Sequence, residues 1–472
     1  MRIPIKKQLR LISIICVGLL IFGNPSWLLG IDNKRPNLIF ILADDCTYKD
    51  LELYGGQAKT PFMNQLSKEG MKFSRVYQSA AMCSPTRHAL YTGLHPVKSG
   101  AYPNHANAYS HVKSVAHYLS DLDYRVILAG KQHIGPDSVF PFEHFDEFAE
   151  PEKSDVVPVN GWRYPQIFNA LESTKEASPV CMFLCSNEPH GPYNKGDASK
   201  YPKSQVKMSP QLLDTHFEAY CKYLAEITYF DGQVGEIMEM LKTLDLEDNT
   251  LLIVSTEQGS AFPYGKWTCY EMGVASGMVA RWPGKIARGS QTNSIVEYVD
   301  IVPTFIDVAG GKSKDGLDGR SIKAMLLGQK IEPKKFAYSE HTTLAVNGAK
   351  DPYGIRTVVN NRYRYIRNLF PENNFSIPSS RRAVKAAQRQ GLDAVSFIKK
   401  YMKRPAHELY DIIQDPYCEN NLAENPEYNK IMKSLSLELD DWMQSQGDKG
   451  RQTELEAMDH VAQWLKQKLN KN

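Results

Sequence analysis

The sequence predicts an α/β fold in which a mostly parallel central sheet is flanked by helices and followed by a smaller C-terminal α+β domain. Short, continuously apolar runs, typical of strands buried on both faces, recur four times. Segments with helical periodicity separate these runs, and strands that alternate with helices indicate a parallel sheet. The last part of the chain instead has the pattern of a hairpin followed by amphipathic helices.

Each of the four apolar runs ends in polar residues. The runs cover residues 37–43, 124–129, 179–185 and 250–254, and helical patterns are expected over 61–70, 85–93, 111–122 and 210–244. The polar endings are Asp44-Asp45, Gly130-Lys131-Gln132-His133, Asn187-Glu188-Pro189-His190 and Glu257-Gln258-Gly259. Ligands of such sheets bind beyond the carboxyl ends of the strands. One polar ending is common in a plain turn, but four of four predict a single site built from loops far apart in the sequence.

The domain boundary is expected near residue 335, between a catalytic domain over 31–335 and a smaller domain over 336–472. Residues 353–368, with the turn Asn360-Asn361-Arg362, predict a hairpin. Helices are expected over 432–444 and 454–469, and the basic segment 372–403 has no clear assignment.

The charge balance of the chain excludes a composition-based argument for nucleic-acid binding. The 472 residues include 56 basic and 53 acidic ones, which gives a net charge of +3. A local cluster of charge could still attract an anionic ligand.

The cysteines are more informative than the net charge. Seven cysteines lie outside the N-terminal leader, which is an odd number, and their spacing matches neither a disulfide framework nor a zinc-binding pattern. At least one of these cysteines is therefore expected to have a role other than disulfide pairing.

The N-terminus predicts a secretory signal peptide over residues 1–30, cleaved near Gly30. Residues 1–10 carry four basic side chains and no acid, and an apolar run over 11–23 precedes Asn24-Pro25-Ser26. About 13 apolar residues are short for a membrane span. We therefore expect a secreted or periplasmic protein without stable membrane insertion. Cys16 lacks the small residues that precede a lipidated cysteine, so a lipoprotein is disfavoured, while an uncleaved anchor stays as the alternative.

Cys83 is the cysteine whose surroundings indicate chemistry. In Cys83-Ser84-Pro85-Thr86-Arg87, Pro85 suits the first position of a helix. Cys83 is then at or just before a helix N-terminus, where negative charge is favoured. Arg87 follows four residues later and projects from the same face. A cysteine at such a place is more often a buried small apolar residue, so the prediction depends on the other groups expected nearby.

The polar strand endings supply the donor set of a hard divalent cation. Asp44, Asp45 and Glu257 offer anionic oxygens and Gln258 a neutral one, which suits Ca²⁺ or Mg²⁺ rather than zinc. Five cationic or proton-donating groups accompany them: Arg87, Lys131, His133, His190 and Lys266. A metal ringed by such groups describes a pocket for a tetrahedral oxyanion, sulfate or phosphate. In isolation, each of these residues would be an ordinary cap, turn, surface or core residue.

The chain resembles the formylglycine-dependent sulfatases (type I) of the alkaline phosphatase superfamily. Cys-x-Pro-x-Arg at 83–87, followed by Thr92-Gly93, is the signature of that family. Further segments resemble its other elements: 35–45 its first strand and metal aspartates, 130–135 its Gly-Lys-x-His-x-Gly element, 189–192 its Pro-His-x-Pro element, 265–271 its Gly-Lys-x-x-x-Tyr-Glu element, and 408–423 its C-terminal segment. Residues 130–142, with Tyr353-Gly-Ile-Arg356 and Asn368-Leu369, look most like the heparan N-sulfatase (sulfamidase) branch.

The resemblance implies a modified nucleophile and a bound metal. Cys83 would be oxidised by a formylglycine-generating enzyme to 3-oxoalanine (formylglycine), whose hydrated form attacks sulfur. One Ca²⁺ per chain would be held by Asp44, Asp45, residue 83, Glu257 and Gln258. Arg87 and Lys131 would hold the developing charge, His190 or Lys266 would protonate the leaving atom, and His133 would deprotonate the second hydroxyl, which then expels sulfate.

One departure concerns Glu257-Gln258, where the family usually has Asp-Asn or Asp-His. Both side chains are one methylene longer, so the backbone must lie farther from the metal or the coordination must change. Ca²⁺ tolerates such variation better than Mg²⁺ does.

We therefore expect an exported sulfuric ester hydrolase that removes sulfate from a carbohydrate, as an O-sulfate ester or an N-sulfate. A phosphonate or phosphate ester hydrolase of the same superfamily is one alternative, and a sugar-binding relative without metal is another. Glu188, His105, His341 and Arg356 are weak candidates for sugar contacts, and each is otherwise expected to be a surface residue.

Overall fold

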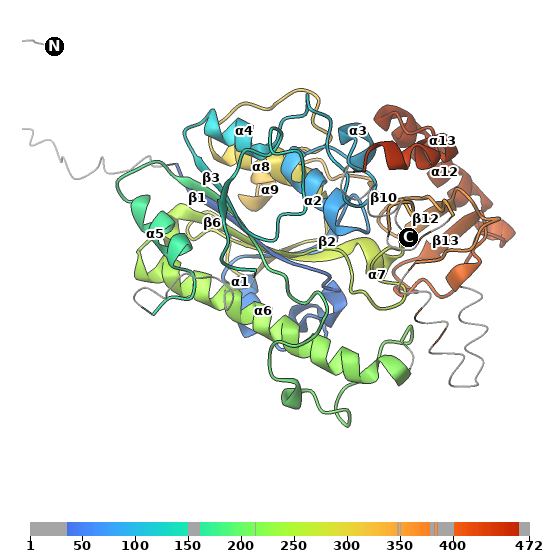
Figure 1. Cartoon of the computed structure of the whole chain (residues 1–472), viewed down its shortest axis with the longest axis horizontal. Coiled ribbons are helices and arrows are strands. Elements are labelled where there is room, and N and C mark those ends of the chain that lie inside the picture. The colour runs from blue at the N-terminus through green and yellow to red at the C-terminus, as the bar shows by residue number, and fades with distance from the viewer. Residues whose placement is uncertain are drawn as a thin grey trace, which may run out of the picture. The chain divides into compact units, whose positions relative to one another are not determined.

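Nine strands of the described chain form the central sheet of this computed structural model (Figure 1). Their order is β4-β3-β5-β1-β6-β7-β2-β8, and β9 pairs with β2. The bounds are β1 (Asn37–Ala43), β2 (Met71–Tyr77), β3 (Arg125–Gly130), β4 (Glu143–Phe145), β5 (Val180–Cys185), β6 (Thr250–Thr256), β7 (Ala275–Arg281), β8 (Ser290–Thr292) and β9 (Val296–Glu297). The structure describes residues 35–461 apart from 150–160, 213, 347–348, 350, 378–381, 383–384 and 386–400.

The four strands predicted from the apolar runs are neighbours in this sheet. β3, β5, β1 and β6 lie side by side and are parallel to one another. Phe40 of β1, for example, stands between Phe183 of β5 and Ile253 of β6. Their carboxyl ends therefore meet at one edge. The α/β class with a mostly parallel sheet is confirmed, and within the described part of this central sheet the antiparallel pairs are those of β7 with β6 and with β2.

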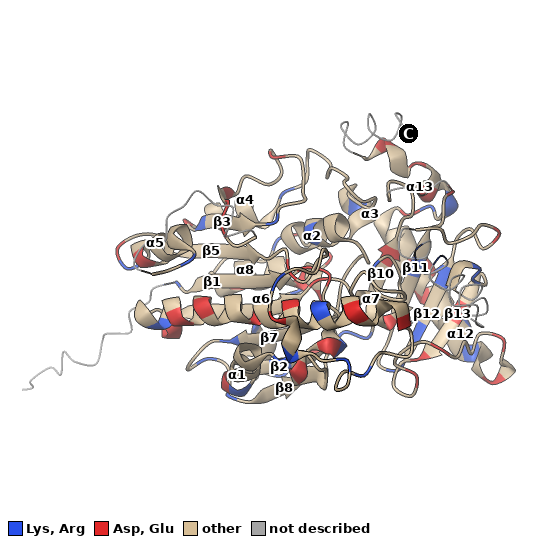
Figure 2. Ribbon diagram, turned by 60° about the horizontal axis from the view of Figure 1, so that its bottom comes forward, with Lys and Arg blue, Asp and Glu red and all other residues tan. Residues whose placement is uncertain are grey.

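Helices cover both faces of the central sheet (Figure 1). Leu38, Phe40 and Leu42 of β1 pack in one apolar cluster with α2 (Cys83–Thr92), α4 (Val115–Ser120) and α8 (Ile301–Val308). Ile39, Ile41 and Ala43 pack in the other with α1 (Pro61–Glu69), α5 (Pro165–Ser173) and α6 (Phe217–Thr243). Alternate side chains of a strand point to opposite faces, so β1 contributes to two cores at once. Both acidic and basic residues occur along α6 (Figure 2).

A second sheet of four antiparallel strands follows in the sequence. Its strands, in order, are β10 (Ala337–His341), β11 (Ile355–Val359), β12 (Tyr363–Asn368) and β13 (His407–Asp411). β11 and β12 form the predicted hairpin. The helix α12 (Asn429–Gln446) packs through Leu435, Leu439 and Trp442 on this sheet. The predicted α+β character of this region is confirmed, whereas the boundary after residue 335 stays a prediction.

The edge strand β10 bonds to the segment that precedes Cys83. The backbone N–H of Glu340 donates to the carbonyl of Ser79 at 2.9 Å, and that of Ala81 donates to the carbonyl of Glu340 at 3.3 Å. Residues 79–81 are therefore held from both sides, because the N–H of Gln78 also donates to the carbonyl of Val274 at 2.9 Å. The second sheet thus helps to position the start of α2.

Several predicted helix bounds change in the structure. α2 begins at Cys83, so Pro85 is its third residue rather than its first. The first turn tolerates proline there because its N–H groups have no intrahelical partner. α6 begins at Phe217 rather than near residue 210, after the 3₁₀ turn Asp214–His216. At the C-terminus, α13 (Arg451–Leu455) and the 3₁₀ turn Ala457–Asp459 replace the first part of the predicted helix 454–469.

The predicted signal peptide and residues 462–469 lie outside the described residues. Within the described ranges, no helix has both the length and the apolar character needed to cross a bilayer.

Candidate active site

The site begins where backbone pairing continues past the ends of the parallel strands. The N–H of Glu257 donates to the carbonyl of Ala43 at 2.9 Å, and the N–H of Asp44 donates to the carbonyl of Glu188 at 2.9 Å. The N–H of Lys131 donates to the carbonyl of Cys185, also at 2.9 Å. These bonds fix the first residue after each strand, so side chains from loops far apart in the sequence converge.

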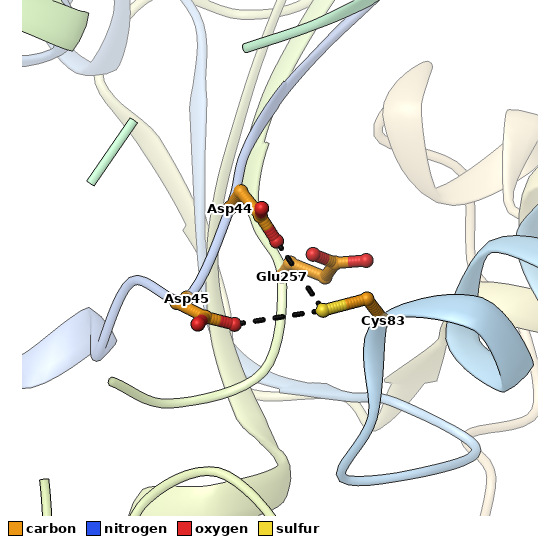
Figure 3. Close-up of side chains that lie close together, drawn as sticks. All are labelled: Asp44, Asp45, Cys83 and Glu257. Carbon is orange, nitrogen blue, oxygen red and sulfur yellow. Dashed lines mark hydrogen bonds between the residues drawn. The ribbon is translucent and has the colours of Figure 1, made fainter. Parts of the chain in front are cut away.

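Cys83 faces this edge as the first residue of α2 (Figure 3). Its Sγ lies 3.6 Å from Oδ1 of Asp44 and 3.7 Å from Oδ1 of Asp45. Ligand atoms of these three residues and of Glu257 all lie within 4.8 Å of one another. In Figure 3 the three carboxylates come from two neighbouring loops and surround the thiol. The predicted convergence of strand ends on Cys83 is therefore present.

Three cationic side chains balance the three carboxylates. Nζ of Lys131 pairs with Asp44, and Nζ of Lys266 lies 2.7 Å from Oδ1 of Asp45 and 3.0 Å from Sγ of Cys83. The Arg87 guanidinium, one turn along α2 from Cys83, has its Nε 2.9 Å from Oε1 of Glu257. All the ion pairs are nearly or fully buried, with Lys131 the most exposed of their members. Each buried charge has a partner, as low polarity requires.

The two predicted histidines occupy different places. Nε2 of His190 lies 3.5 Å from Oδ2 of Asp45, at the open side of the cluster. His133 makes no hydrogen bond or ion pair with the cluster among the described residues. Its Nε2 is instead 2.6 Å from Nδ1 of His105. Both His105 and His133 have left-handed backbone, with φ of 59° and 57°, a conformation uncommon for residues other than glycine.

The pKa values of the cluster follow from burial and from its charges. Burial acts to raise the pKa of Asp44, but the Lys131 ammonium, a hydrogen bond from Glu257 and the Arg87 guanidinium hold it well below its usual value. Burial raises the pKa of Glu257 well above its usual value; Arg87 opposes this rise and Asp44 adds to it. Burial and the Asp44 carboxylate also raise the pKa of the Cys83 thiol. An unmodified Cys83 is therefore a protonated, poor nucleophile at neutral pH.

The donor set fits a hard divalent cation. Oε1 of Gln258 is buried and has no hydrogen-bond partner among the described residues, while its Nε2 donates to Oδ1 of Asp45 at 2.6 Å. Rotating the amide by half a turn would exchange the two atoms, which would bring the carbonyl oxygen next to Asp45 and Cys83. Three carboxylates and one amide oxygen form the oxygen-rich set that Ca²⁺ binds. The longer side chains of Glu257 and Gln258 thus reach the cluster.

An aromatic cleft opens beside the cluster. It has a volume of about 530 Å³ and begins at Asp45, His190 and Lys266. Its remaining wall is formed by Gly191, Pro192, Tyr193, His216, Ala219, Ala261, Phe262, Pro263, Trp267 and Arg382. A group that leaves the reacting centre on this side has room for at least one ring.

Comparison with known proteins identifies the family. Residues 36–311 match the family model described as "Sulfatase", and residues 259–378 match the one described as "N-sulphoglucosamine sulphohydrolase, C-terminal". Over 423 residues the chain is 33% identical to an ulvan-active sulfatase of Formosa agariphila, covering 88% of this chain and 81% of that protein. The chain belongs to the sulfatase family. The predictions of a sulfatase fold and of a sulfuric ester hydrolase are confirmed.

Two further relatives extend the comparison. This sulfatase is 24% identical over 468 residues to the N-sulphoglucosamine sulphohydrolase of Homo sapiens, covering 88% of this chain and 91% of that protein. Its fold matches the solved structure of the phosphonate monoester hydrolase of Agrobacterium radiobacter with a TM-score of 0.66, at 17% identity, covering 87% and 96% of the two chains.

The structure corrects three of the four weak candidates for sugar contacts. His341 and Arg356 are both fully buried rather than at the surface. Nε of Arg356 bonds Oδ2 of Asp448, which closes a structural ion pair in the second sheet. Glu188 is also largely buried, with a pKa raised to about 8 by burial and by the nearby Glu226. None of these three residues is therefore the surface residue that the sequence led us to expect.

Sequence reasoning missed two features of the site. No local signal placed His105 against His133, because 28 positions separate them and only the folded loops bring them together. The aromatic wall was also missed, although Tyr193 follows the Pro-His-Gly-Pro element directly and Trp267 follows Lys266. Aromatic residues that flank a catalytic motif would have been the available signal.

Proposed function

We propose that this sulfatase hydrolyses O- or N-sulfate groups of a sulfated carbohydrate, with a formylglycine made from Cys83 and with Ca²⁺. The observation that supports this most strongly is the arrangement of Cys83 among three buried carboxylates and three buried cations. Because the pKa of Glu257 is raised, the six charges cancel once Ca²⁺ has displaced the proton of this carboxyl, and the bound ion would then leave an excess of positive charge that favours a sulfate group.

The modified residue and the metal supply what the encoded side chains lack. A hydrated aldehyde at residue 83 beside Ca²⁺ provides a hydroxyl nucleophile of lowered pKa. Asp44, Asp45, Glu257, Gln258 and residue 83 would hold the ion. Cys83 in its encoded form has a raised pKa, which is consistent with its being a precursor.

The cations beside residue 83 have two tasks. Arg87 and Lys131, fixed by Glu257 and Asp44, are rigid donors for the oxygens of the sulfate group. Donors that are already oriented stabilise charge as it develops without reorganising. Lys266 and His190 line the cleft on the side where the leaving group departs, so either can donate the proton that the leaving oxygen or nitrogen needs. His133, held by His105, is the base assigned to release of sulfate.

The cleft supports a carbohydrate as the leaving group. Ring faces of sugars pack well on aromatic side chains, and the wall offers Tyr193, Phe262 and Trp267. The names of two relatives refer to ulvan and to N-sulphoglucosamine, both sulfated carbohydrates. We also propose that the protein is exported by its basic and apolar leader, and that a formylglycine-generating enzyme modifies it during maturation.

The test combines a chemical and an enzymatic measurement. The protein is produced in a host that can oxidise the cysteine, and mass spectrometry of the peptide with residue 83 is expected to detect the aldehyde, with Ca²⁺ present by metal analysis. Sulfate release is then measured on defined sulfated saccharides, with paired aryl sulfate and aryl phosphate esters. Cys83→Ala should abolish turnover, whereas Cys221→Ala, in α6, should not. An unmodified thiol without metal would refute the proposal, and preference for the phosphate ester would favour a phosphoesterase.

A further inference from the structure

The cleft beside the reacting centre has a charge pattern of its own. Among its described lining residues the one carboxylate is Asp45, which Lys266 already neutralises at 2.8 Å. The remaining titratable groups of the lining are basic or neutral: His190, His216, Tyr193 and Arg382. A ligand in the cleft therefore meets positive charge without a competing acid.

Arg382 lies at the side of the cleft formed by His216 and Tyr193. Burial lowers the pKa of His216 and the Arg382 charge lowers it further, so the two side chains are electrostatic neighbours. Burial raises the pKa of Tyr193, and the charges of Lys266 and Arg382 both oppose that rise. Tyr193, Lys266 and Arg382 thus line the same cleft, and both cations are near enough to act on the Tyr193 hydroxyl.

The aromatic wall defines the space between these two charges. The rings of Tyr193 and Phe262 stack, with centroids 5.8 Å apart and an angle of 24° between their planes. The ring of His216 meets Phe262 edge-on at 5.9 Å. Such a wall gives a flat apolar surface for a sugar ring. A ring lying on this wall shares the cleft with Lys266, His216 and Arg382, so its substituents have cationic groups of the same cleft available to them.

The basic segment that the sequence left without an assignment contributes this second charge. Every charged residue between 378 and 400 is basic except Asp393, and Arg382 within it lines the cleft. A guanidinium binds carboxylate and sulfate oxygens through paired N–H donors. The segment therefore adds an anion-binding group to the cleft beyond the scissile bond.

We infer that the cleft binds a sugar unit that carries a second negative group, a carboxylate or another sulfate, and that Arg382 recognises it. This inference rests on the proposed function, because it assumes that the leaving group is a carbohydrate. Arg382 is then a specificity-determining residue, and neutral neighbours of the sulfated sugar are poor substrates.

The test compares Arg382→Gln with a matched control. Lys385→Gln removes a positive charge from the same segment, three residues away and outside the cleft lining. Three disaccharides that share the same sulfated unit serve as substrates, and their second unit is neutral, a uronate or itself sulfated. For Arg382→Gln, kcat/KM should fall about tenfold on the charged substrates, the effect of losing one charged hydrogen-bond pair. The neutral substrate should be unaffected, and Lys385→Gln should match the wild type on all three.

Each outcome has a separate meaning. A fall on the uronate alone identifies a carboxylate, and a fall on the disulfated substrate alone identifies a second sulfate. Equal effects on charged and neutral substrates, or no effect on any, would overturn the inference. Binding of the same disaccharides to Cys83→Ala, measured by calorimetry, makes the result independent of turnover. If the wild type hydrolyses none of them, the proposed function fails, and equal binding of charged and neutral disaccharides would refute the cleft inference by itself.

Discussion

Replacing Arg87 by methionine should destabilise the protein in a way that Ca²⁺ reverses. Nε of Arg87 lies 2.9 Å from Oε1 of Glu257, and both side chains are fully buried. At an effective dielectric constant of about 20, unit charges at this separation attract by about 6 kcal/mol. Desolvation offsets part of that attraction, and breaking a buried pair from one side costs about 3–5 kcal/mol. We expect a loss of this size for Arg87→Met in the absence of divalent ions.

Ca²⁺ should restore much of the lost free energy of unfolding. Without Arg87, and with Glu257 ionised, the cluster has three carboxylates and two cations, so a bound divalent cation compensates an excess of negative charge that the wild type does not have. At about 100 times its dissociation constant a ligand adds about 2.7 kcal/mol to the stability of the protein that binds it. At the same Ca²⁺ concentration the variant should gain more than the wild type does.

Arg364→Met is the matched control. Arg364 is also fully buried, and its Nη2 lies 2.7 Å from Oε2 of Glu271 in an ion pair that includes no residue of the cluster. It should lose a similar amount of stability, and Ca²⁺ should not reduce that loss. Urea unfolding of the wild type and of both variants, in EGTA and in saturating Ca²⁺, measures the loss of stability of each variant under each condition. If Ca²⁺ stabilises Arg87→Met no more than the wild type, the charge account of the site is wrong.

Three further predictions concern protons. Burial raises the pKa of Glu340 to about 8, so its contribution to stability is present at low pH and is lost as pH rises from about 4.5 toward 8. Between about pH 5 and pH 8 the wild type should lose about 3 kcal/mol that Glu340→Gln retains, and parallel urea curves for the two proteins would contradict this. Because the pKa of Glu257 is raised, Ca²⁺ binding should release protons and tighten with rising pH; calorimetry in buffers of different ionisation enthalpy measures the release, and a pH-independent affinity would exclude it. His105→Ala should lower kcat about tenfold with KM unchanged, because His133 loses the partner 2.6 Å from its Nε2; an effect on KM alone would assign His105 to substrate binding.

The sequence was sufficient for the four neighbouring parallel strands β3, β5, β1 and β6 and for the residues at their carboxyl ends, whereas the other five strands of the nine-stranded sheet were not predicted. The apolar runs are continuous because β3, β5, β1 and β6 are covered on both faces, and this pattern is local. Asp44 and Glu257 follow adjacent parallel strands, so their proximity follows from topology alone. A local pattern and one rule of sheet geometry were thus enough to predict the cluster.

Contacts over long distances in the sequence could not be predicted. Arg356 and His341 were expected at the surface, but Arg356 pairs with Asp448, 92 positions later. Its burial depends on a partner that no local pattern indicates. The same holds for the bonds between β10 and residues 79–81. The predicted first residue of α2 was wrong for a different reason. Proline is compatible with any position in the first turn of a helix, so Pro85 did not define where α2 begins.

The burial of α2 bears on the order in which the proposed oxidation of Cys83 and the folding of the chain can occur. Every residue from Cys83 to Thr92 is buried, and the segment that precedes this helix bonds to Glu340 of β10 and to Val274. A second protein cannot reach the cysteine in such a setting, so the oxidation that we propose would have to occur before the chain folds. The oxidation of Cys83 would then compete with folding. The fraction of modified protein from an expression host would depend on the rate of oxidation relative to the rate of folding, and slower folding should raise that fraction.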